Sequence, residues 1–349
     1  MFRRSGMKGN YAYTVTRVKA KKSQLLKEED YSKMLMMTVP EISRYISESG
    51  YSKEMTELAS RTSGIDLLEH ATYSNMAKIF SSILSASKGE LYGMVSAYLT
   101  KWDIWNLKVI LRGKSYGLSA DGIREDLVPA GKLDVESLDK LISSDSDDDV
   151  IANFSKMAHI NFPPEVLSAY KSSGNLGDLE DFLDRFHYER LAGSISPNTM
   201  PSRLFLDYVK KEIDAKNFET ILKLKFEGIS GDVVMKYVIP GGKVIDSKMA
   251  AQMADAETAE GVMTGMTDVA FYEEIKDFWD PTTLRGIMAG LKKYEIHQAE
   301  KFSHMYPLSV VPVIDYMIHK EIEVNNIRAI ARGTESGLDR ETIKGLLVI

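Results

Sequence analysis

Apolar residues recur every three to four positions along almost the whole chain, which is the spacing of amphipathic helices with one buried face. A clear example lies before position 106, where Leu91, Met94, Val95, Tyr98 and Trp102 follow this spacing. No convincing strand pattern appears, so the sequence predicts an all-α protein. The expected helices cover residues 10–26, 31–37, 41–47, 52–61, 67–86, 90–114, 134–144, 144–158, 179–192, 202–227, 241–275, 281–302 and a last stretch from near 307 to just before 337.

One stretch of this pattern, residues 98–131, occurs three times. Counted from Asn106, the same chemistry returns 111 residues later at Asn217 and 109 residues after that at Asn326. Each copy has an acid three residues before the asparagine and, after it, a cation, a glycine, a serine or aspartate, a second acid and two apolar residues. A proline follows in the first two copies. The matching residues are Asp103, Asp214, Glu323; Arg112, Lys223, Arg332; Gly117, Gly228, Gly337; Ser119, Ser230, Asp339; Asp121, Asp232, Glu341; Ile123, Val234, Ile343; Leu127, Val238, Leu347; and Pro129, Pro240.

These positions suit a helix, a turn and a second helix. Gly117 is expected to end the first helix in the left-handed conformation that only glycine adopts cheaply, and Leu118 could complete a Schellman-type cap. Ser119 is the right side chain to accept an orphan amide at the start of the next helix, and Asp121 suits the positive end of its dipole. A proline and a glycine then close the copy.

The repeated asparagine needs its own explanation, because asparagine inside a helix costs about half a kcal/mol relative to alanine and competes for backbone hydrogen bonds. We expect it to bond to a neighbouring helix or turn and so to fix helix packing, with the acid one turn earlier helping. A ligand-binding role is the alternative. It is less favoured because a binding site is seldom copied three times with the same local sequence.

The repeat divides the chain into three units, residues 1–131, 132–242 and 243–349. The length exceeds a usual single domain of about 100 to 200 residues, and the 44% hydrophobic and 27% charged content is that of a soluble globular protein. Cysteine is absent, which excludes disulfides, thiolate chemistry and sulfur-based zinc sites. No apolar run approaches the ~18 residues of a membrane span, and no signal-like apolar core begins the chain. The protein is expected to be soluble by itself.

The net charge of −6 argues against general nucleic-acid binding, which needs a basic surface. The first 23 residues are an exception, because they hold basic residues and no acid, enough to contact a phosphate or a lipid headgroup. A solvated basic helix face or a contact with an acidic protein is the alternative interpretation. The basic residues are Arg3, Arg4, Lys8, Arg17, Lys19, Lys21 and Lys22.

No catalytic constellation is found. The glycine run PGGKV at residues 240–244 has valine where a phosphate-binding loop needs a hydroxyl, and neither a GxGxxG after a strand nor a GxSxG is present. The histidines never fall four apart, which excludes a two-histidine metal face on one helix but not ligands from distant segments. They are His70, His159, His187, His297, His304 and His319.

Acidic clusters also lack the context that chemistry requires. Asp145, Asp147, Asp148 and Asp149 invite a calcium interpretation, but the glycine and the glutamate of a calcium loop are missing. We expect a loop or the charged start of a helix there. Paired carboxylates such as Glu28 with Glu29 have no apolar setting that would raise a pKa. The sequence predicts no catalytic, cofactor-binding or metal-binding residue.

The three repeats resemble the C subunit of archaeal and bacterial A/V-type ATP synthases, a family that includes the d subunit of vacuolar ATPases. The resemblance extends over almost the whole chain, from the opening YAYTVTRVKAKKSQLL to the closing KEIEVNNIRAIARG with Gly337 after it, and WDIWNLKVILRG in the first unit is nearly as specific. It implies three similar helical bundles in a pseudo-threefold, funnel-like array.

The resemblance also implies a function. Such a subunit is a non-catalytic part of the rotor that joins the D and F shaft subunits to the membrane ring of proteolipid subunits and passes on the torque of proton or sodium flow. It would need no cofactor and would lie at the cytoplasmic face of the membrane, attached through the ring. A helical-repeat scaffold for a soluble partner is the alternative, and a phosphate- or nucleic-acid-binding protein that uses the basic N-terminal segment is a third class.

Overall fold

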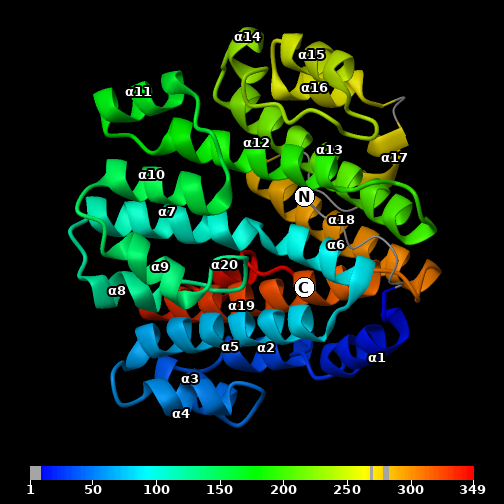
Figure 1. Ribbon diagram of the computed structural model, residues 1–349. Coiled ribbons are helices and arrows are strands. Elements are labelled where there is room, and N and C mark those ends of the chain that lie inside the picture. Colours follow the sequence, from blue (N-terminus) through cyan, green and yellow to red (C-terminus); the bar gives the residue numbers. More distant parts are fainter. Residues whose placement is uncertain (1–8, 268–269, 278–282) are drawn as a thin grey trace. The chain divides into compact units, whose positions relative to one another are not determined.

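The computed structural model describes residues 9–267, 270–277 and 283–349, and all regular structure in these ranges is α-helical (Figure 1). The all-α prediction is therefore confirmed. Asp280 before Pro281 has the sequence of a helix N-cap followed by proline at the first helical position, but both residues lie outside the described residues, as do Arg3, Arg4 and Lys8.

The helices follow one order three times after α1 (Tyr11–Lys22): three short helices, two long stretches and one short helix. The first series is α2 (Glu28–Met34), α3 (Val39–Ser47), α4 (Ser52–Leu58), α5 (Gly64–Ala86), α6 (Gly89–Leu99) with α7 (Lys101–Ser115), and α8 (Ala120–Glu125). The second is α9 (Val135–Ile142), α10 (Asp147–Ala158), α11 (Pro164–Ser173), α12 (Gly177–Ser194), α13 (Met200–Phe226) and α14 (Gly231–Val234). The third is α15 (Ser247–Asp255), α16 (Ala259–Gly265), α17 (Ala270–Ile275), α18 (Leu284–Met305), α19 (Val311–Glu335) and α20 (Arg340–Lys344).

The single helix expected over residues 90–114 is wrong in one respect, because it is interrupted at Thr100, between α6 and α7. The Thr100 amide and hydroxyl both donate to the carbonyl of Ala97, at 3.3 and 2.5 Å. A bond to the third preceding carbonyl is a 3₁₀ turn, and a threonine hydroxyl bound to the backbone competes with the helix ladder. Periodicity in the side chains does not reveal such a local break.

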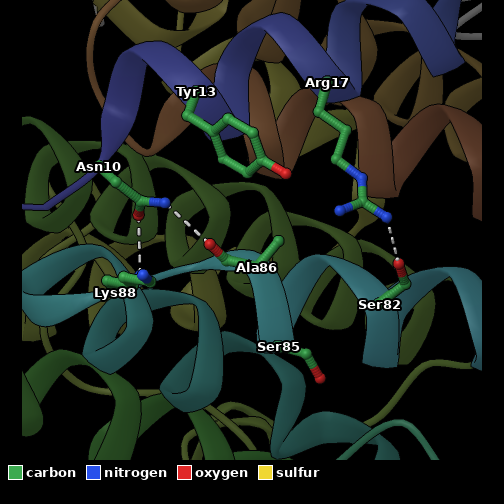
Figure 2. Close-up of a pocket in the computed structure, with 7 residues that line it drawn as sticks. All are labelled: Asn10, Tyr13, Arg17, Ser82, Ser85, Ala86 and Lys88. Carbon is green, nitrogen blue, oxygen red and sulfur yellow. Dashed lines mark hydrogen bonds between the residues drawn. The ribbon is translucent and has the colours of Figure 1, made fainter.

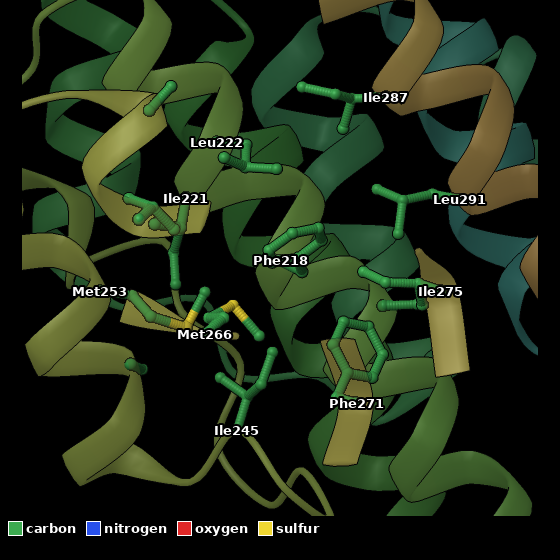
Figure 3. Packing of buried hydrophobic residues seen from close by; sticks show 14 of the residues in the cluster. Phe218, Ile221, Leu222, Ile245, Met253, Met266, Phe271, Ile275, Ile287 and Leu291 are labelled. Carbon is green, nitrogen blue, oxygen red and sulfur yellow. The ribbon is translucent and has the colours of Figure 1, made fainter. Parts of the chain in front are cut away.

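Two compact units make up the structure: residues 1–180 with 316–347 and Ile349, and residues 181–315 with Val348. Each unit has a core that joins helices of different copies. In the second unit, α13 and α14 pack with α15 to α18, and Phe218, Ile221, Met266 and Phe271 lie in this core (Figure 3). The division into 1–131, 132–242 and 243–349 stays a prediction.

The first unit repeats this arrangement across the two ends of the chain. Ile327, Ile330 and Ile343 of α19 and α20 pack with residues of α2 to α5 such as Ile42 and Leu68, all of them buried. Figure 1 shows α19 and α20, in red, beside α5 and α2, in blue. Helices from the third series thus complete the core of the first.

The predicted helix ends are confirmed at the three repeated glycines. Gly117, Gly228 and Gly337 have φ of 70°, 73° and 70°. After each one, the next amide donates to the carbonyl five residues before it, as in Leu118 to Gly113 at 2.9 Å, which is the long bond of a Schellman cap. The apolar contact expected of Leu118 is incomplete, because this residue is 50% exposed.

Replacing Gly117 by alanine should lower the free energy of unfolding by about 1 kcal/mol, since a Cβ disfavours the left-handed conformation even where space is open. Gly93 is the control, because it lies inside α6 without the left-handed φ and its alanine variant should be neutral or slightly stabilising. Urea denaturation measures both. Equal stability of Gly117→Ala and the wild type would contradict this account of the turn.

Candidate functional site: a clamp repeated along the chain

The repeated asparagine holds a loop that follows it by 22 residues. In the first copy, Asn106 donates its Nδ2 to the carbonyl of Val128 at 2.9 Å and accepts the Val128 amide on Oδ1 at 2.8 Å. In the second copy, Asn217 makes the same pair with Ile239, at 2.8 and 2.7 Å. Both asparagines are fully buried. The structural interpretation of this residue is therefore confirmed in two copies.

The acid one helical turn earlier holds the same loop farther along. Asp103 accepts the amides of Lys132 and Leu133, each at 2.9 Å. Asp214 accepts the amides of Val244 and Ile245, at 3.0 and 2.9 Å. Two side chains of one helix thus satisfy the buried backbone groups of each loop, and the loop leads directly into the first helix of the next series. We call this arrangement a clamp: the acid and the asparagine of one copy together with the backbone groups that they hold.

The glycine that closes each copy has a steric reason that the sequence pattern does not reveal. A Cβ at Gly131 would lie 2.1 Å from Asp103 Oδ1, and a Cβ at Gly242 would lie 2.3 Å from Asp214 Oδ1. Only glycine lets the carboxylate approach the backbone this closely. The PGGKV run, which is not a phosphate loop, contains one of these glycines. Both glycines stand 25 residues after their asparagine, and they are the glycines that the sequence predicts at the close of the first two copies.

In the third copy, the acid holds the beginning of the chain. Glu323 Oε2 accepts the amide of Leu26 at 2.5 Å, and Leu26 stands two residues before α2, as Leu133 stands two before α9. Asn326 is buried and hydrogen-bonds to the hydroxyl of Tyr31 on α2. The third clamp therefore acts on the first series of helices, and the repeat closes on itself.

A buried ion pair accompanies this third clamp. Lys320 Nζ lies 2.7 Å from Glu323 Oε1, and the two side chains are 4% and 3% exposed. The Tyr51 hydroxyl donates to Glu323 at 2.6 Å, and the Lys320 ammonium lies 4.0 Å from the centre of the Tyr51 ring. Burial lowers the pKa of Lys320, and the Glu323 carboxylate opposes that shift. Such a pair is costly to break from one side, because the other charge is left uncompensated.

The repeated cation also reaches the next series in two copies. Arg112 binds Glu180 of α12 through two parallel hydrogen bonds, at 2.8 and 2.5 Å. Arg332 binds Glu69 of α5 through the same bidentate pair of hydrogen bonds, from its Nε and Nη2 to the two carboxylate oxygens. In the second copy Lys223 instead contacts Glu219 on its own helix at 2.6 Å. Bidentate guanidinium–carboxylate pairs fix orientation as well as distance, so Arg332 ties the last long helix to the first.

Other residues singled out in the sequence have structural roles. Asp147, Asp148 and Asp149 form the first turn of α10, with Ser146 as its N-cap, so the expectation of a charged helix start is confirmed. His70 lies 3.5 Å from Glu125 and 3.6 Å from Asp126, and hydrogen bonding to Asp126 raises its pKa. Glu28 and Glu29 are exposed at the start of α2.

Asn106→Ala should lower the free energy of unfolding by about 3 kcal/mol, because it leaves both the carbonyl and the amide of Val128 buried without a partner. Thermal and urea denaturation measure the loss. Asn153→Ala is the control, since the hydrogen bond of the Asn153 side chain within the described ranges is a single one, to the hydroxyl of Ser144 at 3.2 Å. An Asn106 variant as stable as the wild type would contradict a structural role for the clamp.

Asp214 should make stability depend on pH. Burial raises the pKa of Asp214 to about 6 against the opposing backbone amides, so the folded state binds the proton more tightly than the unfolded chain, whose aspartate pKa is about 4. The wild type should therefore lose about 2 kcal/mol relative to Asp214→Asn as the pH rises from about 4 to about 7. Urea denaturation across this range measures the difference.

Asp232→Asn is the control for that experiment, because Asp232 is an exposed acid of the same repeat. The stability difference between the wild type and Asp232→Asn should be almost constant over the range. A difference between the wild type and Asp214→Asn that grows in favour of the wild type with rising pH would contradict a raised pKa of Asp214 in the folded state.

Comparison with known proteins places these features in a family. The model of the family described as ATP synthase (C/AC39) subunit matches residues 14–346. The A-type ATP synthase C subunit of Methanococcoides burtonii is 36% identical over 99% of this chain and 96% of its own length. The proteins of that name from Methanosarcina barkeri and Archaeoglobus fulgidus are 37% and 33% identical, over 97% and 99% of this chain and 93% and 98% of theirs. Among the described residues, no helix has the length and apolarity to cross a membrane. By the family model and by these relatives, the chain belongs to the ATP synthase (C/AC39) subunit family.

Proposed function

We propose that this chain is the non-catalytic central-stalk subunit of an A-type or V-type ATP synthase. It joins the D and F shaft subunits to the proteolipid ring and transmits torque for proton- or sodium-coupled ATP synthesis. The observation that carries the proposal is the similarity to the C subunits of A-type ATP synthases over 97% to 99% of the chain. In this proposal the chain is a peripheral component at the cytoplasmic face of the membrane, and it holds no active site of its own.

The internal ties of the first unit support this role. A torque-carrying part must resist shear between its helices, and the clamps fix each loop through several charged or buried hydrogen bonds. Arg332 and Glu323 tie the last helices to the first ones, so a load on either end of the sequence is shared by both. We propose that the three copies form three bundles in pseudo-threefold, funnel-like array, with their glycine turns on one rim.

The glycine turns also carry exposed apolar side chains, which suits contact with a partner. Tyr116 is 82% exposed and Leu118 50% in the first copy, Phe226 is 44% exposed in the second and Leu338 45% in the third. Large exposed apolar side chains within two residues of the glycine in each copy favour a shared binding rim over scattered surface residues.

Capture from detergent-solubilised membranes tests the proposal. The tagged chain should bring down proteolipid and shaft subunits together. Tyr116→Ser should reduce this capture without changing the melting temperature, because the tyrosine is almost fully exposed, whereas Tyr92→Ser, which changes a 45% exposed tyrosine on α6, should not. Capture of a soluble partner and never of the ring would instead favour the helical-repeat scaffold.

The purified chain should neither bind nor hydrolyse ATP. A coupled phosphate-release assay with the wild type and the Asn106→Ala variant measures this. Turnover that follows the protein through purification and changes with mutation would contradict the non-catalytic assignment.

A further inference from the structure

A groove of about 640 Å³ lies between α1 and the C-terminal end of α5. It is lined by Asn10, Tyr13, Arg17, Ser82, Ser85, Ala86 and Lys88 (Figure 2). The clamps do not use these residues, and the proposed rotor role does not require them.

The groove is held open by contacts on both sides of α1. Asn10 donates to the carbonyl of Ala86 and accepts the amide of Lys88, both at 2.8 Å, which pins the start of α1 to the end of α5. Val15 and Val18 bury the opposite face of α1, at 4% and 1% exposed. The walls are therefore set by the fold, and a ligand need not order them.

The lining is cationic and polar. Arg17 and Lys88 supply two positive charges, and none of the seven lining residues is an acid. Arg17 donates one N–H to Ser82 Oγ at 2.9 Å, and among the residues that the structure describes its other N–H groups make no further hydrogen bond. Within the described residues, no ion pair engages Arg17 or Lys88.

Hydroxyl groups complete the lining. Figure 2 shows Tyr13 and Arg17 both pointing from α1 toward α5. The Tyr13 hydroxyl can donate into the groove, and so can the Ser82 hydroxyl, whose oxygen already accepts from Arg17. The neighbouring acid Glu90 accepts the hydroxyl of Tyr11 at 3.0 Å, outside the lining.

We propose that this groove binds a phosphate group borne by a small organic ligand or a lipid. A guanidinium that presents parallel N–H groups and two hydroxyl donors, with the positive charge of a lysine in the same lining, suits a phosphate monoester or diester. The volume exceeds that of the phosphate, so the group attached to it also fits inside. The exposed Lys19 on α1 adds to the positive field but does not line the groove.

Titration calorimetry on the full-length protein tests the proposal, with glycerol 3-phosphate as the soluble probe. Co-sedimentation with vesicles of phosphatidylglycerol in phosphatidylcholine tests the lipid source, against vesicles of phosphatidylcholine alone. Arg17→Gln should weaken binding at least tenfold, because it removes charge-assisted hydrogen bonds, and Lys88→Gln should weaken it about fivefold. Lys19→Gln, the matched loss of one charge on the same helix, should change it less than twofold.

The outcomes separate the sources. Binding of the soluble probe that depends on Arg17 supports a phosphorylated small molecule, and vesicle binding with the same dependence supports a lipid headgroup. Equal weakening by Arg17→Gln and Lys19→Gln would overturn the proposal in favour of a diffuse basic surface, as would no binding of either probe. If Arg17→Gln lowers the melting temperature, Lys88→Gln provides the test instead. Capture of proteolipid and shaft subunits tests the proposed function separately, and its outcome does not depend on whether the groove binds a phosphate group.

Discussion

The structure depends on a carboxamide side chain that replaces a missing backbone partner. Asn106 and Asn217 each pair with one residue of a loop 22 positions further on, donating to its carbonyl and accepting its amide, which belong to two successive peptide groups. A loop that runs through a buried position has no helix or sheet ladder to satisfy it, so these two bonds decide whether the loop can be buried. Asparagine inside the helix lowers helix stability by about half a kcal/mol relative to alanine. This loss is small compared with the cost of leaving two buried peptide groups unpaired.

Copying this clamp has a topological consequence. Each of the first two copies holds the loop that leads into the next series of helices, and the third copy holds the segment that leads into the first series. Glu323 does this through Leu26, and Arg332 reinforces it through Glu69. The core that joins α19 and α20 to α2 through α5 follows from the same arrangement. Helices far apart in the sequence thus share hydrogen bonds, an ion pair and a core.

Much of this was predictable from the sequence, because the repeat marks the positions where local chemistry is decisive. The left-handed glycines, the N-caps at Ser119 and Asp339 and the partnered asparagine follow from rules that act within a few residues. The long-range partners of these side chains could not be predicted from the sequence. The pairs of Glu323 with Leu26 and of Lys320 with Tyr51 are fixed by how distant helices pack, and no local sequence rule connects them. The expected serine cap at Ser230 is absent although the residue type is right, and the break at Thr100 depends on a backbone bond that periodicity does not show. The groove between α1 and α5 is likewise invisible in the sequence, apart from the basic character of its N-terminal wall.

Hydrogen exchange on Glu323→Gln tests the closure of the chain most directly. The substitution leaves Lys320 buried beside a neutral partner and weakens the hold on Leu26. If the last clamp holds the first helices, amides of α2, α3 and α4 should lose protection together with those of α19 and α20, while those of α9 and α10 stay protected. Loss of protection confined to α19 and α20 would contradict the claim that the repeat closes on itself.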